Sequence, residues 1–134
     1  MLDHVFLTVR DIEKSIRFYE HALAPLGIIH VLDYDGRLGP EGHPDLKGFG
    51  RDNRVFFWLQ QGKAASNAVH IGFVALGNAE VDAAYAAAIA AGASDNGPPA
   101  YRAYYDPRYY AANFHDPDGH SIEVVYKNWR HASV

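Results

Sequence analysis

The chain has 134 residues, 49% of them hydrophobic and 21% charged, with a formal net charge of −4. This length and composition are typical of one globular domain, and the acidic balance argues against a nucleic-acid binder. The longest apolar run, residues 83–93, is too short to span a bilayer. The absence of cysteine excludes disulfides, thiolate zinc sites and cysteine nucleophiles. No secretory signal is recognised, so we expect a cytoplasmic protein.

The first half of the chain predicts a strand, a helix and three further strands. Residues 4–9 are rich in β-branched and large apolar side chains, which is typical of a strand. Asp11 stands where a helix N-cap is expected, and apolar residues follow at helical spacing until Pro25 and Gly27. Further strands are expected at residues 28–33, around Phe49 and at residues 55–60.

The second half repeats this order. Residues 69–75 predict a strand, Asn78 is the expected cap, and residues 79–91 predict an alanine-rich helix that Gly92 ends. A tyrosine-rich stretch and the turn Asp116-Pro117-Asp118-Gly119 then lead to a last strand at residues 122–126.

The two halves are related by one offset. His4 corresponds to His70, and the pair before the fourth strand, residues 52–53, corresponds to residues 118–119, each at a shift of 66. One offset at two landmarks favours a duplicated βαβββ unit over chance similarity. We therefore predict an α+β fold, one domain of two modules (about 1–66 and 67–128) with a short C-terminal tail.

A candidate metal site arises from this symmetry. Strand periodicity places His4 and His70 on equivalent strand faces, opposite the more apolar faces that should pack under the helices. Glu123 lies between Ile122 and Val124, where an unpaired carboxylate is costly to bury. Two imidazoles and a carboxylate bind Zn²⁺, Fe²⁺, Mn²⁺, Ni²⁺ or Co²⁺ and leave positions open.

A structural interpretation of the same residues stays open. A single strand histidine is commonly a hydrogen-bonded or half-exposed residue, and Glu123 could pair with Arg54 or Lys127. His115 and His120 flank the turn and are expected at the surface, and four other histidines have no patterned partner. These four are His21, His30, His43 and His131.

Aromatic and cationic residues suggest a substrate pocket. The segment 101–110 holds five tyrosines and two arginines, which either cover a cavity mouth or pack a dimer interface. The candidate pocket residues are Phe57, Trp58, Arg108, Tyr109 and Tyr110.

Three stretches resemble the vicinal oxygen chelate superfamily of glyoxalase I, fosfomycin-resistance transferases, extradiol dioxygenases and bleomycin-binding proteins. They are Leu2-Asp3-His4-Val5, Asp11-Ile12-Glu13-Lys14-Ser15-Ile16-Arg17-Phe18-Tyr19 and Asp116-Pro117-Asp118-Gly119-His120-Ser121-Ile122-Glu123. The resemblance implies paired βαβββ modules forming a U-shaped mixed sheet around a divalent metal held by His4, His70 and Glu123. It also implies a homodimer with exchanged or edge-paired modules.

One departure from glyoxalase I limits the resemblance. That enzyme has a fourth ligand in the first module, where the 66-residue offset places Phe57, or Phe56 or Trp58 if the alignment slips by one residue. None of these side chains binds a metal, which argues against glyoxalase I activity.

The leading hypothesis is a metal-dependent enzyme acting on a small molecule with vicinal oxygens. No general base stands out, so the reaction remains open between lyase or isomerase, transferase and dioxygenase types. The alternative is a metal-free protein that binds a drug or metabolite, as bleomycin-resistance proteins do.

Overall fold

The computed structural model describes residues 1–127, and the expected C-terminal tail, with His131, lies outside them. The N-terminal half holds β1 (Val5–Val9), α1 (Ile12–Ala22), the 3-10 turn η1 (Ala24–Leu26), β2 (Ile29–Tyr34), the 3-10 turn η2 (Gly36–Leu38), β3 (Leu46–Arg51) and β4 (Arg54–Gln61). The C-terminal half holds β5 (His70–Val74), α2 (Asn78–Ala90), β6 (Ser94–Asp95), β7 (Ala100–Tyr101), β8 (Tyr110–His115) and β9 (Ser121–Tyr126).

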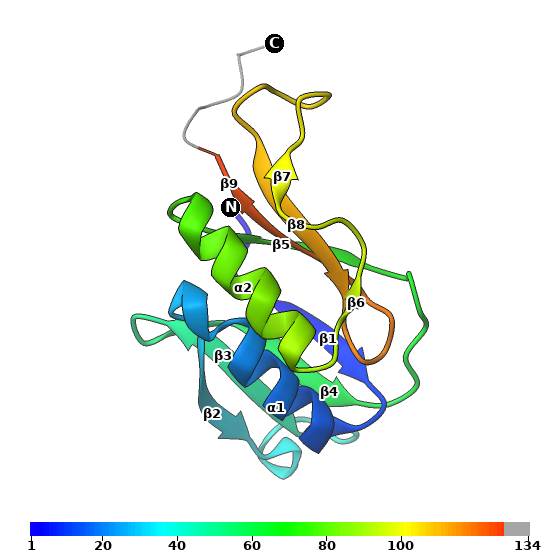
Figure 1. Ribbon diagram of the computed structural model, residues 1–134. Coiled ribbons are helices and arrows are strands. Elements are labelled where there is room, and N and C mark those ends of the chain that lie inside the picture. The colour runs from blue at the N-terminus through cyan, green and yellow to red at the C-terminus, as the bar shows by residue number, and fades with distance from the viewer. Residues whose placement is uncertain (128–134) are drawn as a thin grey trace.

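Each half forms its own mixed sheet (Figure 1). The strand order is β1-β4-β3-β2 in the first sheet and β5-β9-β8-β6 in the second, with β7 also paired to β8. In both halves the first strand runs parallel to the last, and the remaining pairs are antiparallel. The predicted α+β class is confirmed, and β1 and β5 each lie at the edge of a sheet.

The second half departs from a simple βαβββ order after α2. Two short strands, β6 and β7, both pair with β8 in place of one continuous strand. The residues between them include Gly97, with a φ of 132°, and two prolines. Proline lacks the N–H that a ladder needs, so this segment cannot pair along its whole length.

The helix ends follow the sequence at Asp11 and at Gly92, whereas α1 already ends at Ala22, before Pro25. The Asp11 side chain accepts a hydrogen bond from Lys14 N, as an N-cap should. Gly92 follows α2 with a φ of 106°, which glycine adopts readily. The prediction for Asn78 is wrong by one residue, because Asn78 is the first helical residue and Gly77 precedes it. None of the described helices has the length and apolarity needed to cross a membrane.

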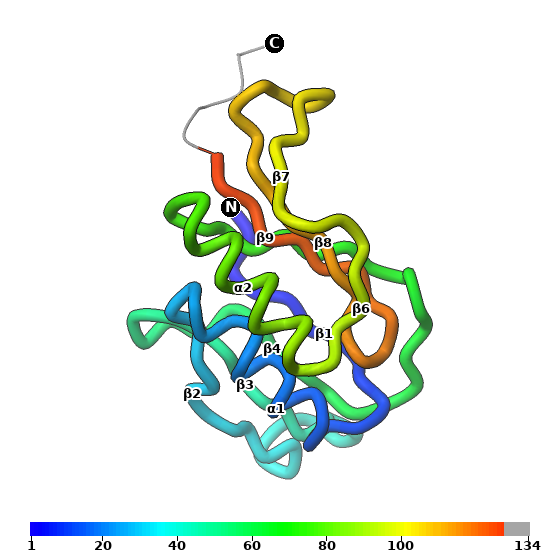
Figure 2. Tube along the Cα trace, in the orientation of Figure 1, coloured from blue at the N-terminus to red at the C-terminus, as the bar shows by residue number. Residues whose placement is uncertain are grey.

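One core joins the two halves. The helices pack against each other, with α1 on β4 of the first sheet and α2 on β8 and β9 of the second; Figure 2 follows the chain through this arrangement. Phe57 links the halves, since its ring contacts Tyr19 at 5.0 Å and Phe73 at 5.3 Å between centroids. Leu7 and Phe73 are buried, whereas Phe6 and Val74 on the opposite strand faces are 45% and 70% exposed. The predicted inward faces are therefore confirmed.

Candidate metal site

His70 and Glu123 lie together because β5 and β9 are parallel neighbours. The pairing register sets His70 beside Ser121 and Gly72 beside Glu123, so the Glu123 side chain lies next to the start of β5. His70 Nε2 is 3.2 Å from Glu123 Oε1. Gly72 contributes no side chain, and a Cβ there would meet nothing within 4 Å. The surface beside the pair is therefore open to a ligand.

Both side chains are held by further hydrogen bonds. His70 Nδ1 lies 2.7 Å from Ser121 Oγ, which turns Nε2 toward the carboxylate. Asn113 Nδ2 donates to Glu123 Oε1 at 3.3 Å, and the Tyr109 hydroxyl donates to the other oxygen, Oε2. Burial, followed by this bond to Glu123, raises the pKa of Tyr109 far above its usual value, so the phenol stays a donor.

This geometry fits two neighbouring ligands of one divalent metal. Nitrogen and oxygen ligands stand about 2.0–2.2 Å from such a metal, which sets two adjacent donors about 3 Å apart. The 3.2 Å between His70 Nε2 and Glu123 Oε1 agrees with that spacing. The Ser121 hydroxyl oxygen, hydrogen-bonded to His70 Nδ1, is the kind of partner that orients a metal-binding imidazole from outside the ligand set.

His4 lies on the other sheet, just before β1. Its Nδ1 is 2.7 Å from Asp3 Oδ1, so its ring is also oriented by an oxygen, and Nε2 is the nitrogen left to bind a metal. The hydrogen bond with His4 lowers the pKa of Asp3, and Arg54 acts in the same direction. Within residues 1–127 of one chain, the donor atoms of His4, His70 and Glu123 do not form one group. A single chain brings two of the three predicted ligands together.

The pairing register corrects the expected counterpart of Glu123. Gly72 pairs with Glu123, and the equivalent strand residue Phe6 pairs with Trp58. The counterpart is therefore Trp58, and Phe57 is fully buried in the core. A bulge opposite Phe49 and Gly50 shifts the register by one residue, which a constant 66-residue offset cannot represent.

The tyrosine-rich segment divides between two faces of its sheet. Tyr109 reaches Glu123, whereas the hydroxyl of Tyr110 donates to Asp82 of α2 at 2.6 Å on the helix side. Arg108 donates through Nε to Asp106 Oδ1 at 2.9 Å. Tyr109, one of the predicted pocket residues, therefore contacts a candidate metal ligand.

A cavity of about 250 Å³ adjoins His4 on the open face of the first sheet. Trp58 borders this cavity together with Tyr34, at the end of β2, and His43, in the loop after β2, and the sequence analysis did not single out the last two as pocket residues. Its lining residues are Asp3, His4, Phe6, Tyr34, His43, Leu46, Val55 and Trp58. No pattern in the sequence marks His43, because it lies between strands in a segment without periodicity.

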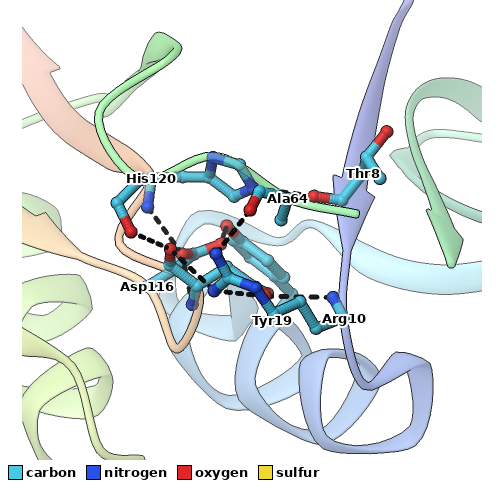
Figure 3. A network of polar contacts seen from close by, with 8 residues as sticks. Thr8, Arg10, Tyr19, Ala64, Asp116 and His120 are labelled. Atoms are coloured by element: carbon cyan, nitrogen blue, oxygen red, sulfur yellow. Dashed lines mark hydrogen bonds and ion pairs between the residues drawn. The ribbon is translucent and has the colours of Figure 1, made fainter. Parts of the chain in front are cut away.

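The turn before β9 holds another polar cluster (Figure 3). In the described part of the chain, one group of three potential metal-binding side chains has its donor atoms within 4.8 Å of one another, and it consists of Asp116, Asp118 and His120. Asp116 Oδ1 accepts the backbone N–H groups of Asp118 and His120, and its Oδ2 accepts the Tyr19 hydroxyl at 2.6 Å. These bonds already use the carboxylate, which argues for a structural role.

The same cluster ties the two halves together. Asp118 Oδ1 accepts from the backbone N–H of Arg10 at 3.0 Å, and His120 Nε2 donates to the Thr8 carbonyl at 2.7 Å. The expectation that His120 lies at the surface is wrong, since it is 3% exposed. Turns such as the one before His120 usually lie at the surface, which is why the sequence predicts an exposed side chain. In the structure this turn packs against the end of β1, through Thr8 and Arg10.

Comparison with known proteins places this chain in a family. A family model described as Glyoxalase/Bleomycin resistance protein/Dioxygenase superfamily matches residues 1–124. The chain belongs to this superfamily, as its motifs predicted. A comparison with curated proteins yields no match.

Solved structures agree with the fold. A glyoxalase/bleomycin resistance protein from Albidiferax ferrireducens T118 is 28% identical, with a TM-score of 0.73 over 95% of this chain and 98% of that one. A glyoxylase/bleomycin resistance protein/dioxygenase domain from Frankia sp. EAN1pec is 18% identical, with a TM-score of 0.70 over 96% and 98%. A mutant of the fosfomycin resistance protein FosX from Listeria monocytogenes, complexed with Mn(II) and 1S,2S-dihydroxypropylphosphonic acid, is 20% identical, with a TM-score of 0.66 over 92% and 87%.

Proposed function

We propose that this protein is a divalent-metal-dependent enzyme that acts on a small molecule with two adjacent oxygens. His70 and Glu123 would hold the metal in one chain, and His4 of a second copy would complete the site. The observation that carries the proposal is the 3.2 Å pair of His70 Nε2 and Glu123 Oε1, oriented by Ser121 and Tyr109.

The chain's own residues have distinct roles in this proposal. A bound divalent metal supplies Lewis-acid stabilisation of a developing oxyanion. Ser121 and Asp3 orient the two imidazoles through Nδ1. Tyr109 and Asn113 hold the Glu123 carboxylate, so that one oxygen faces His70. A ligand set of two nitrogens and one oxygen would leave coordination positions for both substrate oxygens.

The exposed strand faces support a homodimer. Phe6 on β1, with His4 just before that strand, and His70 and Val74 on β5 lie on open faces at the edges of two separate sheets. Exposed apolar residues on such edges indicate a surface that another chain covers. A second copy that brings its β1 beside β5 would bury Phe6 and Val74 and supply the missing imidazole.

The test is metal binding by the purified, tag-free protein. Mn(II) is the first metal to try, because the Listeria FosX structure contains it. We expect one Mn(II) per chain, measured by electron paramagnetic resonance, and loss of binding in His70→Ala and Glu123→Gln. His21→Ala is the matched control, because His21 lies on α1 away from these strands. Unchanged affinity in both site variants would overturn the proposal.

A metal-free binding protein is the second candidate. The aromatic walls around His4, formed by Phe6, Tyr34 and Trp58, favour it, since such walls can hold a flat ligand without a metal. Tight binding of a ring compound by metal-stripped protein, with no stoichiometric metal, would support this candidate over the enzyme.

A further inference from the structure

The cavity beside His4 is complete within the N-terminal half of one chain. Its lining residues all come from the start of the chain, β1, β2, β3, β4 and the loop after β2, so its walls do not depend on how two copies assemble. Phe6, Tyr34 and Trp58 provide aromatic surface. A volume of about 250 Å³ admits a single flat ring with its substituents.

His43 is fixed in the wall of this cavity. Its Nδ1 lies 2.8 Å from the carbonyl oxygen of the next residue, Pro44. One side of the ring meets Tyr34, with centroids 5.2 Å apart. Another side rests on Gly39, where an added Cβ would lie 3.0–3.2 Å from three atoms of His43. The ring has little room to turn.

This hydrogen bond decides the tautomer of the neutral imidazole. A carbonyl oxygen only accepts, so Nδ1 must carry the proton and Nε2 must carry the lone pair. The loop is itself anchored, since Asp45 accepts a hydrogen bond from Gly36 N at 2.8 Å. His43 therefore offers a pre-oriented proton acceptor in the same cavity that His4 lines.

We propose that His43 is the general base of this protein, acting on a planar ligand that carries an acidic O–H beside a second oxygen. This inference rests on the proposed function and supplies the base that sequence reasoning lacked. The O–H bond of the ligand breaks, its proton forms the Nε2–H bond of an imidazolium, and the electron pair stays on the ligand oxygen. No oxidant or reductant is needed for this step.

The test uses 4-nitrocatechol as the probe, since it is flat, has two adjacent hydroxyls and changes colour on losing a proton. His43→Asn keeps an amide N–H for the Pro44 carbonyl but removes the Nε2 lone pair. We expect the acid dissociation constant of the bound probe to fall about tenfold in this variant, the size of one hydrogen bond to a charged group. His21→Asn is the matched control, because His21 Nδ1 makes the same kind of bond to the Arg17 carbonyl at 2.7 Å.

Two further measurements keep the outcomes separate. Mn(II) affinity is measured in the same samples. If both wild type and His43→Asn bind Mn(II) normally and the bound probe ionises equally in both, the assignment of His43 is overturned and the metal site stands. If Mn(II) does not bind, the proposed function fails, and the metal-free probe titration then decides on His43 alone. In ¹⁵N-histidine-labelled wild type, the probe should move the His43 Nε2 resonance toward the protonated range. An unmoved resonance overturns the inference without any variant.

Discussion

Glu123 is the residue on which the candidate metal site depends. It is 8% exposed and receives hydrogen bonds from Tyr109 and Asn113 while facing His70. These neighbours hold a carboxylate that would be costly to bury without partners. The arrangement resembles the outer partners of metal sites, which set both the orientation and the basicity of a ligand.

Replacement of Tyr109 by phenylalanine should therefore weaken metal binding. Loss of the hydroxyl frees Glu123 Oε2 and lets the carboxylate rotate away from His70, so we expect Mn(II) affinity to fall about 10–100-fold. Isothermal titration measures the change. Tyr110→Phe is the matched control, since its hydroxyl bonds to Asp82 on the helix side. Equal affinity in Tyr109→Phe and wild type would contradict this role.

At the scale of elements, β8 connects the candidate site to a helix. Its first residue, Tyr110, donates to Asp82 of α2 at 2.6 Å, while the preceding Tyr109 contacts Glu123 of β9. Successive residues of a strand point to opposite faces. The alternation therefore explains why one tyrosine serves the site and its neighbour serves the packing of α2.

The contribution of the Tyr110–Asp82 hydrogen bond to stability should fall at alkaline pH. This hydrogen bond, followed by burial, raises the pKa of Tyr110 to about 12. A tyrosine whose pKa rises on folding stabilises the fold fully below its unfolded value of about 10, and loses that contribution as pH rises through the folded value. The difference in unfolding free energy between wild type and Tyr110→Phe, from urea titrations, should be constant at neutral pH and shrink above about pH 10. A difference that grows in this range would contradict the contact.

For the whole molecule, the buried cluster at Asp116 and the shared aromatic core hold the halves in one arrangement. Asp116 accepts from Tyr19 of α1, and His120 donates to Thr8 of β1. Both partners belong to the N-terminal half, more than 90 residues away in the chain. Burial and the nearby carboxylate raise the pKa of Tyr19 well above its usual value, so it stays a donor at neutral pH.

Tyr19→Phe should destabilise the whole protein. The variant leaves a buried carboxylate oxygen of Asp116 without its hydroxyl partner, which costs about 1–3 kcal/mol. Thermal and urea unfolding measure this loss. Tyr85→Phe is the control, because Tyr85 donates to Asp95 at 2.9 Å on the exposed surface, where water replaces the partner. Similar losses in the two variants would show that burial of the cluster is not what matters.

The assembly of the candidate site predicts complementation between variants. His4→Ala and His70→Ala should each fail to bind Mn(II) as homodimers. When the two are unfolded together and refolded, each mixed dimer should regain one of its two sites, because one chain supplies His4 and the other supplies His70 and Glu123. Binding that is never regained, in mixtures shown by mass spectrometry to contain mixed dimers, would place all three ligands in one chain.

Much of the fold follows from local sequence. The strand at β1, the Asp11 cap, the end of α2 at Gly92 and the inward face of β5 depend on residue type and spacing along a few residues. The pairing of His70 with Glu123 also follows once the halves are seen as a duplicated unit, since the first and last strands of each unit are neighbours. These features are set by short-range physical preferences that one sequence displays directly.

Other features depend on contacts between residues far apart in the chain. The one-residue bulge in β4 places Trp58 at the position equivalent to Glu123 and buries Phe57, whereas a constant offset places Phe57 at that position. The burial of His120 and the place of His43 beside His4 depend on how loops fold onto β1 and the open sheet face.

The sequence by itself determined the superfamily, the two-part α+β fold and the three candidate ligands, because hydrophobic period, caps and turns are local. Only the tertiary structure decided which ligands meet within one chain and which histidine faces the cavity, because those distances come from packing and strand register.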